Sequence, residues 1–196
     1  MELQNQPPYE LRSARFLAAE VHARVLRPSD TVVDATLGNG HDACRLAELV
    51  GPAGRLIGLD IQPEAVSRSR ERLTEVGLID RCELHALSHD LMAEVVPEPV
   101  RLIVFNLGWL PGGDKRVTTH WETTERAVRA ALTLLQPGGV LTVCAYPGHA
   151  AGNEERNALP GLFAALRPQD FNVLHQRFLN AGPGAPECFV AQKQDN

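Results

Sequence analysis

An asparagine and a tryptophan directly follow an apolar run in the middle of the chain. Residues 102–105 read Leu-Ile-Val-Phe, and Asn106-Leu107-Gly108-Trp109 comes next. An asparagine carbonyl accepts a hydrogen bond from a substrate N–H group, and a neighbouring indole holds a flat ring or a cation by stacking. Ligands of an open α/β sheet bind where strands end, so this pair suits chemistry on nitrogen. A turn with a half-buried tryptophan is the alternative interpretation.

A glycine loop follows an earlier β-branched run. The segment from Asp34 to Gly40 reads Asp-Ala-Thr-Leu-Gly-Asn-Gly. Glycines let a backbone approach a ligand without a Cβ clash, and a carboxylate receives an ammonium group directly or through water. Residues 41–43 are His, Asp and Ala, so the third glycine of the dinucleotide fingerprint is missing and a pyrophosphate ligand is disfavoured. A simple turn would also explain Gly-x-Gly.

An acid ends the next apolar run. Residues 55–60 read Arg-Leu-Ile-Gly-Leu-Asp, and a carboxylate at such a strand end can hydrogen-bond both ribose hydroxyls of an adenosine cofactor. An enzyme that uses NAD would need the same acid. Asp60 could instead cap the helix that Pro63 begins.

Strands and helices alternate along the chain. Apolar and β-branched runs predict strands at residues 31–35, 55–60, 82–86, 101–105, 140–145, 171–178 and 187–192. Helical spacing and capping signals predict helices at residues 8–26, 41–50, 63–76, 90–95, 121–135 and 154–166. The glycine-rich segment 136–139 reads as a turn. This alternation predicts an α/β fold with a mostly parallel seven-stranded sheet, helices on both faces, and one antiparallel edge strand contributed by the last strand pair.

Length and composition favour one globular domain. The 196 residues are 44% hydrophobic and 22% charged, and we expect a single domain over residues 1–196 whose first 28 residues form a leading helical segment. The formal net charge is −5, so a nucleic-acid partner would need a local basic patch. Arginines of the leading helix could form one, or could simply be solvated: Arg12, Arg15, Arg24 and Arg27.

Targeting and metal signals are missing from the sequence. No apolar run approaches the length of a membrane-spanning helix, and the first eight residues lack the features of a secretory signal, so we expect a cytoplasmic protein with no membrane partner. The four cysteines are far apart and form no C-x-x-C pair, which predicts small buried side chains and no metal site: Cys44, Cys82, Cys144 and Cys188.

The glycine loop and the asparagine motif together carry a family resemblance. The segment 34–40 resembles the first motif of class I methyltransferases that use S-adenosyl-L-methionine, and Asn106 to Trp109 keeps the ends of the Asn/Asp-Pro-Pro-aromatic motif but changes its middle. Segments 34–42, 105–115, 146–149 and 152–155 resemble a small methyltransferase family labelled rRNA methylases. Some members methylate the 5-aminomethyl group of 2-thiouridine at the tRNA wobble position.

The resemblance implies a Rossmann-like class I methyltransferase fold with S-adenosyl-L-methionine as cofactor. The residues it places at the cofactor are Asp34, Thr36, Gly38, Asn39, Gly40, Asp42, Asp60, Gln62, Ser88 and His89. Ser88 could equally be a helix cap. A homodimer is a further expectation from the family, and no stripe of this chain proves it.

The resemblance also implies methyl transfer to an exocyclic primary amine. Such an amine must be neutral to react, and if its pKa is near that of lysine, about 10.4, the neutral form lies roughly 4 to 5 kcal/mol uphill at pH 7. We expect Asn106 to accept the amine protons, Trp109 to exclude water or stack on the base, and Asp114 to orient or take a proton. Asp114 could equally cap a turn.

Candidate substrate contacts follow the fourth and fifth predicted strands. They are Lys115, Arg116, Tyr146 and His149. Lys115 and Arg116 would hold phosphates or be solvated, and a lone histidine is more often structural. The leading hypothesis is therefore a tRNA wobble-uridine amine methyltransferase that binds the anticodon region. The alternatives are a methyltransferase of another RNA, small-molecule or protein amine, and a non-catalytic nucleotide-binding scaffold.

Overall fold

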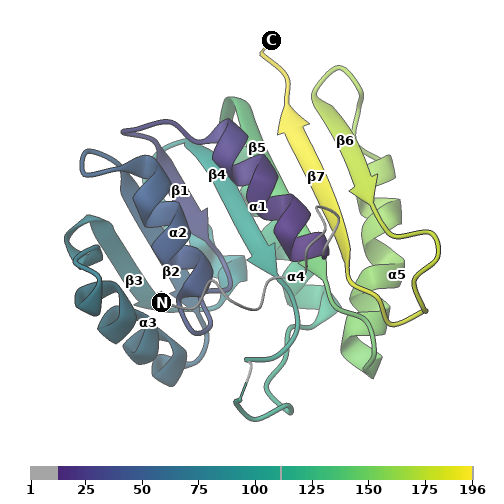
Figure 1. Cartoon of the computed structure of the whole chain (residues 1–196). Helices are drawn as coiled ribbons and strands as arrows, with labels where there is room; N and C mark the ends of the chain where they lie inside the picture. The colour runs from purple at the N-terminus through teal and green to yellow at the C-terminus, as the bar shows by residue number, and fades with distance from the viewer. Residues whose placement is uncertain (1–12, 111, 196) are drawn as a thin grey trace.

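Seven strands form one sheet in the order β3-β2-β1-β4-β5-β7-β6 (Figure 1). The computed structural model describes residues 13–110 and 112–195. The strands are β1 (Thr31–Asp34), β2 (Arg55–Asp60), β3 (Cys82–Ala86), β4 (Val100–Asn106), β5 (Leu135–Ala145), β6 (Phe171–Gln176) and β7 (Glu187–Lys193). The helices are α1 (Ala14–Val25), α2 (His41–Val50), α3 (Pro63–Glu75), α4 (Trp121–Leu134) and α5 (Ala150–Ala164), with 3-10 turns η1 (Ile79–Arg81) and η2 (His89–Glu94).

The sheet is parallel except for one strand. Strands β3, β2, β1, β4 and β5 pair in parallel, whereas β7 runs antiparallel to both β5 and β6. The mostly parallel α/β fold with an antiparallel pair at one edge is therefore confirmed. The reversed strand β7 lies one position inside the edge, because it pairs with β5 and leaves β6 outermost.

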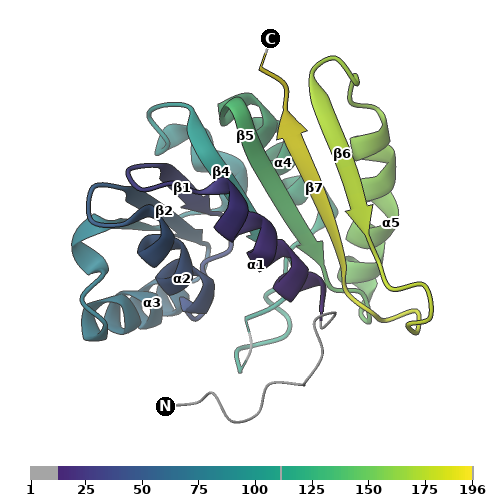
Figure 2. The same cartoon turned by 45° about the horizontal axis from the view of Figure 1, so that its top comes forward.

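Two apolar layers cover the two faces of the sheet. Successive side chains of a strand point to opposite faces, so β4 sends Leu102 and Val104 toward one layer and Ile103 and Phe105 toward the other. Helices α1, α2 and α3 pack on the first face, and α4 and α5 cover the second (Figures 1 and 2). Both faces of the central strands are thus buried, as a parallel sheet requires.

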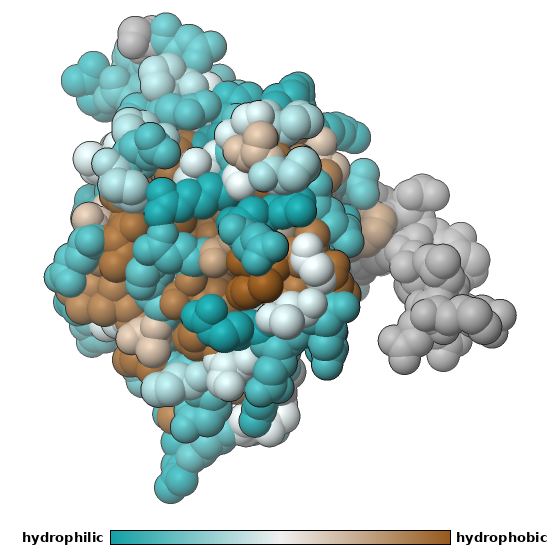
Figure 3. All heavy atoms as spheres, turned by 90° about the vertical axis from the view of Figure 1, so that its left-hand side faces the viewer, coloured by the Kyte–Doolittle hydropathy of each residue, from teal (hydrophilic) through white to brown (hydrophobic). Residues whose placement is uncertain are grey.

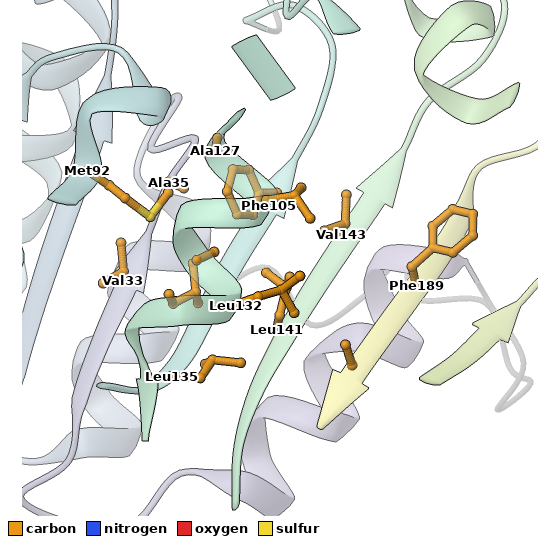
Figure 4. Close-up of a cluster of buried hydrophobic side chains, with 14 of the residues drawn as sticks. Val33, Ala35, Met92, Phe105, Ala127, Leu132, Leu135, Leu141, Val143 and Phe189 are labelled. Atoms are coloured by element: carbon orange, nitrogen blue, oxygen red, sulfur yellow. The ribbon is translucent and has the colours of Figure 1, made fainter. Parts of the chain in front are cut away.

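The layer beneath α4 joins strands far apart in the sequence. Figure 4 shows Phe105 of β4, Val143 of β5 and Phe189 of β7 on the same face of the sheet, with Leu132 of α4 beside them. All but Leu132 are exposed by 1% or less. This packing fixes the carboxyl end of β4, where the candidate asparagine lies.

Apolar side chains also occur on the surface. Ile61, Val76 and Leu91 are exposed, and on the β3 side of the molecule the apolar surface is broken up by polar side chains (Figure 3). Among the described helices none combines the length and apolar character needed to cross a membrane.

Several predicted boundaries differ from the structure, and one lies outside the described residues. Helix α5 begins at Ala150 and not at residue 154, because the His149 side chain caps it by accepting a hydrogen bond from the backbone N–H of Gly152. The predicted turn at 136–139 is part of β5, which accommodates it by a register shift against β4. The predicted start of the first helix at residue 8 lies outside the described residues; α1 begins after the N-cap Ser13.

The sheet has a switch point between β1 and β4. The chain leaves β1 toward β2 on one side and leaves β4 toward β5 on the other, so the two following loops diverge. In open α/β sheets the crevice at such a point, outside the carboxyl ends of the strands, is where ligands bind. The fold therefore positions the glycine loop and the asparagine motif around one opening.

Candidate functional site

A cleft of about 660 Å³ opens at this switch point. Its walls come from the loops after β1, β2, β3, β4 and β5, from the start of α1 and from the β6–β7 connection. The predicted site residues that line it are Thr36, Gly38, Asn39, Asp42, Asp60, Gln62, Ser88, His89, Asn106, Trp109, Tyr146 and His149. Its size and mixed polar and apolar lining are those of a small-molecule site.

The glycine loop is held by its neighbours. The N–H of Gly38 donates to Asp60 Oδ2 at 2.9 Å, and the carbonyl of Gly38 accepts from the Ser69 hydroxyl of α3 at 3.0 Å. The Arg72 guanidinium donates to the carbonyl of Asn39 at 2.9 Å. The loop is therefore fixed in place by β2 and α3 before any ligand arrives.

Gly40 serves the packing of helices and does not line the cleft. Its φ of +76° lies in the left-handed region, and a Cβ there would meet Ser69 Oγ at 2.8 Å and Ser69 Cα at 3.0 Å. Glycine at position 40 lets α2 start close against α3.

Asp34 lies beneath the loop. Its side chain is 1% exposed, Oδ1 accepts from the Thr36 N–H at 3.2 Å, and Oδ2 has no partner among the described residues. Burial, helped by the nearby Asp42 charge, raises the pKa of Asp34 to about 8. Asp34 is not part of the cleft lining, so its direct influence is on the loop backbone.

Asp60 and Gln62 lie where β2 opens into the cleft. Asp60 Oδ1 accepts from the Gln62 N–H at 3.0 Å, and Oδ2 accepts from the Gly38 N–H. Burial raises the pKa of Asp60, and these two backbone N–H groups act against that rise. Each carboxylate oxygen keeps a second lone pair for a ligand hydroxyl.

His89 follows Ser88 in the chain and lines the cleft with its ring packed against Phe105. Its ring lies 5.7 Å from the Phe105 ring, and burial lowers its pKa to about 4, so the imidazole is neutral at pH 7. His89 Nε2 is buried and has no partner within the described part of the chain. The Ser88 hydroxyl donates to Asp90, which is also paired with Arg126.

Asn106 is the last residue of β4 and makes contacts on three sides. Its backbone N–H donates to Thr36 Oγ1 at 2.6 Å, which joins the loops across the switch point. Its side-chain Nδ2 donates to Asp42 Oδ2 at 3.0 Å, and its Oδ1 accepts from the Tyr146 hydroxyl at 3.3 Å. Burial raises the pKa of Tyr146, so that hydroxyl remains a donor at neutral pH.

Trp109 lies against His149. The ring centroids are 4.4 Å apart with a tilt of 57°, and the Lys115 ammonium lies 5.3 Å from the indole centroid. Because His149 Nδ1 accepts from Gly152, its proton is on Nε2, and burial lowers its pKa. The imidazole is thus a neutral side wall beside the indole.

Glu155 anchors the loop that carries Trp109. It is 1% exposed, and its two carboxylate oxygens accept from Thr119 at 2.9 Å and from Thr124 at 2.6 Å. Thr119 Oγ1 in turn accepts from the N–H of Gly108 at 2.8 Å. Sequence reasoning missed this residue as a part of the site, although helical spacing puts it on the face that buries Leu159.

The acidic and basic residues of the outer loop stay outside the cleft lining. Asp114 is paired with Arg116 at 2.6 Å, and the Arg116 side chain is 90% exposed. Neither residue, nor Lys115, lines the cleft. No contact of Asp114 among the described residues therefore supports its predicted role at the reacting atoms.

Metal-binding groups are not gathered anywhere in residues 13–110 and 112–195. No cluster of three or more His, Cys, Asp or Glu side chains is suitably arranged there. Among those residues the cysteines are all unpaired: Cys44, Cys82, Cys144 and Cys188.

Comparisons with known proteins point to one family. The model of the family described as "Putative rRNA methylase" matches residues 56–192. The chain is 35% identical, over 195 residues, to the chloroplastic tRNA (mnm(5)s(2)U34)-methyltransferase of Arabidopsis thaliana, covering 94% of this chain and 71% of the relative.

Solved structures share the whole architecture. A crystal structure of a putative rRNA-methylase from Clostridium thermocellum has a TM-score of 0.92 at 35% identity and covers 94% of this chain and 100% of that one. A putative methyltransferase from Streptococcus mutans in complex with SAH has a TM-score of 0.85 at 29% identity, with coverage of 93% and 99%. The predicted fold is thus confirmed by both.

Proposed function

The chain belongs to the rRNA methylase family and is a methyltransferase that uses S-adenosyl-L-methionine, and from this premise we propose that it methylates an amine of tRNA. The proposed substrate is the 5-aminomethyl group of 2-thiouridine at the wobble position, and the products are the 5-methylaminomethyl group, S-adenosyl-L-homocysteine and one proton. The name of the Arabidopsis thaliana relative supports this choice of substrate.

The cleft residues fit the cofactor. Asp60 offers carboxylate lone pairs to ribose hydroxyls, the buried His89 Nε2 offers an unused polar atom, and the glycine loop offers backbone at close range. When bound, S-adenosyl-L-methionine supplies a methyl group activated by a positively charged sulfur. Asp34 and Gly40 act in this proposal only through the loop that they hold.

The other half of the cleft is suited to a neutral amine. Leu107 and Leu110 are buried, and Trp109 and His149 form an aromatic wall that carries no charge at neutral pH. The exclusion of water by this apolar lining disfavours an ammonium ion and so lowers the roughly 4 to 5 kcal/mol needed to reach the neutral amine. Asn106 Oδ1 accepts an amine N–H and thereby turns the nitrogen lone pair toward the cofactor side.

The single observation that carries the proposal is the placement of Asn106. Asn106 lines the same cleft as Thr36 and Gly38 of the glycine loop, its carboxamide oxygen accepts from Tyr146, and the Thr36–Asn106 hydrogen bond fixes the two halves together. A hydrogen-bond acceptor is thus held beside the cofactor loop, where an amine would react.

The outer loop supplies the proposed RNA contacts. Lys115 lies near Trp109 and Arg116 is exposed, so both can reach phosphates that flank a base inserted in the cleft. Asp114 is left out of the proposed machinery because Arg116 already pairs with it. A homodimer and a cytoplasmic location stay predictions; the Arabidopsis thaliana relative is named as chloroplastic.

Methyl transfer from labelled S-adenosyl-L-methionine tests the proposal. The substrates are tRNA that carries 5-aminomethyl-2-thiouridine, the same tRNA with unmodified uridine at that position, and the free nucleoside. We expect label only in the first tRNA, and little label with Asn106→Ala. Transfer to the free nucleoside or to other amines but not to tRNA would favour a small-molecule methyltransferase, and cofactor binding without turnover on any amine would favour a scaffold.

A further inference from the structure

A line of polar contacts runs from the first helix to the candidate asparagine. The Arg15 guanidinium of α1 holds the Asp42 carboxylate with two nitrogens, Nη2 to Oδ1 at 2.6 Å and Nε to Oδ2 at 2.9 Å. Asp42 Oδ2 also accepts from Asn106 Nδ2 at 3.0 Å, and Tyr146 donates to Asn106 Oδ1. The four side chains come from α1, α2, β4 and the segment after β5.

The α1 end of this line is fixed by packing. Ala14 and Ala18 are buried against the sheet, and the buried His22 contacts Thr142 of β5 through Nε2 and Oγ1 at 2.8 Å. Ser13 caps the helix by accepting from the Phe16 N–H. Arg15 therefore projects from a helix that cannot easily shift, and a two-nitrogen contact to a carboxylate fixes direction as well as distance.

The chemistry of the partners sets the orientation of the Asn106 amide. A carboxylate only accepts hydrogen bonds, so the side of the amide that faces Asp42 must be the NH₂ group. The oxygen then faces Tyr146, which lines the cleft together with Asn106. The Tyr146 hydroxyl is protonated and donates to that oxygen, so this contact agrees with the orientation that the Asp42 carboxylate selects.

A flipped amide would oppose the reaction. With its NH₂ group toward the substrate, Asn106 would donate to the amine lone pair, which is the electron pair that must form the new N–C bond. With its oxygen toward the substrate, it accepts an N–H and leaves the lone pair free.

We propose that Asp42, held by Arg15, is a positioning residue that keeps the Asn106 oxygen directed at the substrate amine. The inference rests on the proposed amine methylation. Asp42 then positions Asn106, whereas the sequence predicted a contact to the cofactor. Both of its oxygens already accept hydrogen bonds inside the protein. The inference gives Arg15 a part in turnover, although that residue neither lies near β4 in the sequence nor touches Asn106.

Kinetics on tRNA bearing 5-aminomethyl-2-thiouridine test the inference. Asp42→Asn replaces an acceptor by a group that can also donate, so we expect kcat to fall roughly 10- to 100-fold, the cost of a misplaced reacting group, while the Kd of S-adenosyl-L-methionine changes less than about threefold. Arg15→Ala should show the same pattern more weakly, and Arg15→Lys should recover part of kcat. Arg70→Ala, which removes an exposed charge from α3, is the matched control.

A double-mutant cycle separates positioning from RNA binding. If Arg15 acts through Asn106, then Arg15→Ala costs little additional kcat in the Asn106→Ala background. If Arg15 instead holds a phosphate, its loss raises the KM for tRNA by the same factor in both backgrounds. This second result, or a cofactor Kd that rises as much as kcat falls, would overturn the inference.

An NMR measurement on the protein without substrate tests the positioning of Asn106 independently of the proposed reaction. In ¹⁵N-labelled protein, the Asn106 side-chain NH₂ signal, assigned with Asn106→Asp, should shift and exchange faster in Arg15→Ala and stay unchanged in Arg70→Ala. An unchanged signal in Arg15→Ala contradicts the positioning role. A shifted signal in a protein that methylates no tRNA leaves the positioning contact intact and refutes only the choice of substrate.

Discussion

The two halves of the cleft are built in different ways. The half after β1 and β2 is held mainly by backbone groups: the Gly38 and Gln62 N–H groups bind Asp60, and the carbonyls of Gly38 and Asn39 bind α3. The half after β4 and β5 is held by side chains from remote elements, including Arg15 and Glu155.

This difference matches what each half must do. A cofactor of fixed shape is served by a loop whose backbone is preset, and the loop residues can be recognised from their glycines and strand-end acids. A substrate group that must be oriented needs side chains with defined hydrogen-bond direction, and these require support from behind. Variants in the first half should therefore change cofactor affinity, and variants in the second half should change turnover.

The largest effect is expected from Asn106→Ala. It removes the oxygen that orients the amine, and we expect kcat to fall at least about 100-fold with the cofactor Kd within about threefold of wild type. Single-turnover kinetics and calorimetry measure the two quantities. A large loss of cofactor affinity with unchanged turnover would reverse the assignment of the two halves.

Asp60→Ala should give the opposite pattern. The loss of a carboxylate that binds two ligand hydroxyls weakens S-adenosyl-L-methionine by roughly 10- to 100-fold, since a hydrogen bond to a charged group is worth about 1.5–3 kcal/mol. At saturating cofactor, kcat should recover to near the wild-type value. If kcat stays low at saturation, Asp60 does more than bind the cofactor.

Glu155→Ala tests the support behind the substrate half. The change leaves the buried Thr124 hydroxyl without its acceptor, and we expect the free energy of unfolding to fall by about 1–3 kcal/mol. The loop with Trp109 should loosen, so kcat/KM for tRNA falls while cofactor Kd does not. Glu154→Ala, at the exposed neighbouring position, is the control. Equal effects of both substitutions would show that the Thr119 and Thr124 contacts do not matter.

Gly152→Ala tests the contribution of the His149–Trp109 contact to the substrate half of the cleft. A Cβ at position 152 would lie 2.3 Å from the carbonyl oxygen of Tyr146 and 2.6 Å from His149 Nε2, so His149, which lies against Trp109, must shift. We expect a loss of about 1–3 kcal/mol in stability and a higher KM for tRNA.

The matched control for this change lies in the same helix. At Gly161 an added Cβ meets nothing within 4 Å, and alanine should stabilise the helix by about 0.5–1 kcal/mol. Thermal unfolding should thus move in opposite directions for the two variants. Unfolding curves that shift alike would mean that the 2.3 Å approach relaxes without cost.

The last prediction concerns the pH dependence of stability and Asp34. Its pKa is about 3.8 in the unfolded chain and about 8 in the folded protein, so the folded state holds the proton longer and stability is lost as pH rises toward 8. Between pH 6.5 and 8 we expect a loss of about 1.4 kcal/mol per pH unit, which Asp34→Asn should remove. The buried His22 and His89 have pKa values of about 4 when folded and 6.5 when unfolded, so near pH 6.5 they add an opposite slope that is the same in wild type and Asp34→Asn and cancels in the comparison. Urea unfolding of both proteins measures the slope, and equal slopes would contradict the pKa.

The sequence was sufficient for the fold and for the position of the cleft because both depend on local patterns. The continuous apolar run of β4 predicts a strand buried on both faces, and the strand-end position of Asp60 and Asn106 puts them at one edge of a parallel sheet. Such arguments need only neighbours in the chain and the handedness of α/β connections.

Contacts between remote residues could not be predicted in the same way. Arg15 and Asp42 are 27 residues apart, and Asp42 and Asn106 are 64 apart, so no periodicity relates them. Asp114 was expected near the reacting atoms, but its turn directs it to Arg116 two residues later. The early start of α5 depends on a histidine cap, which composition alone does not indicate.

The most direct test of the central claim is the identity of the wobble nucleoside in cells. Mass analysis compares tRNA from wild-type cells, from cells that lack the gene, and from deletion cells that express wild-type protein or Asn106→Ala. The account predicts that 5-aminomethyl-2-thiouridine accumulates in the deletion, that the wild-type gene restores its N-methylated form, and that Asn106→Ala does not. The same N-methylated nucleoside at wild-type level in the deletion cells would contradict it.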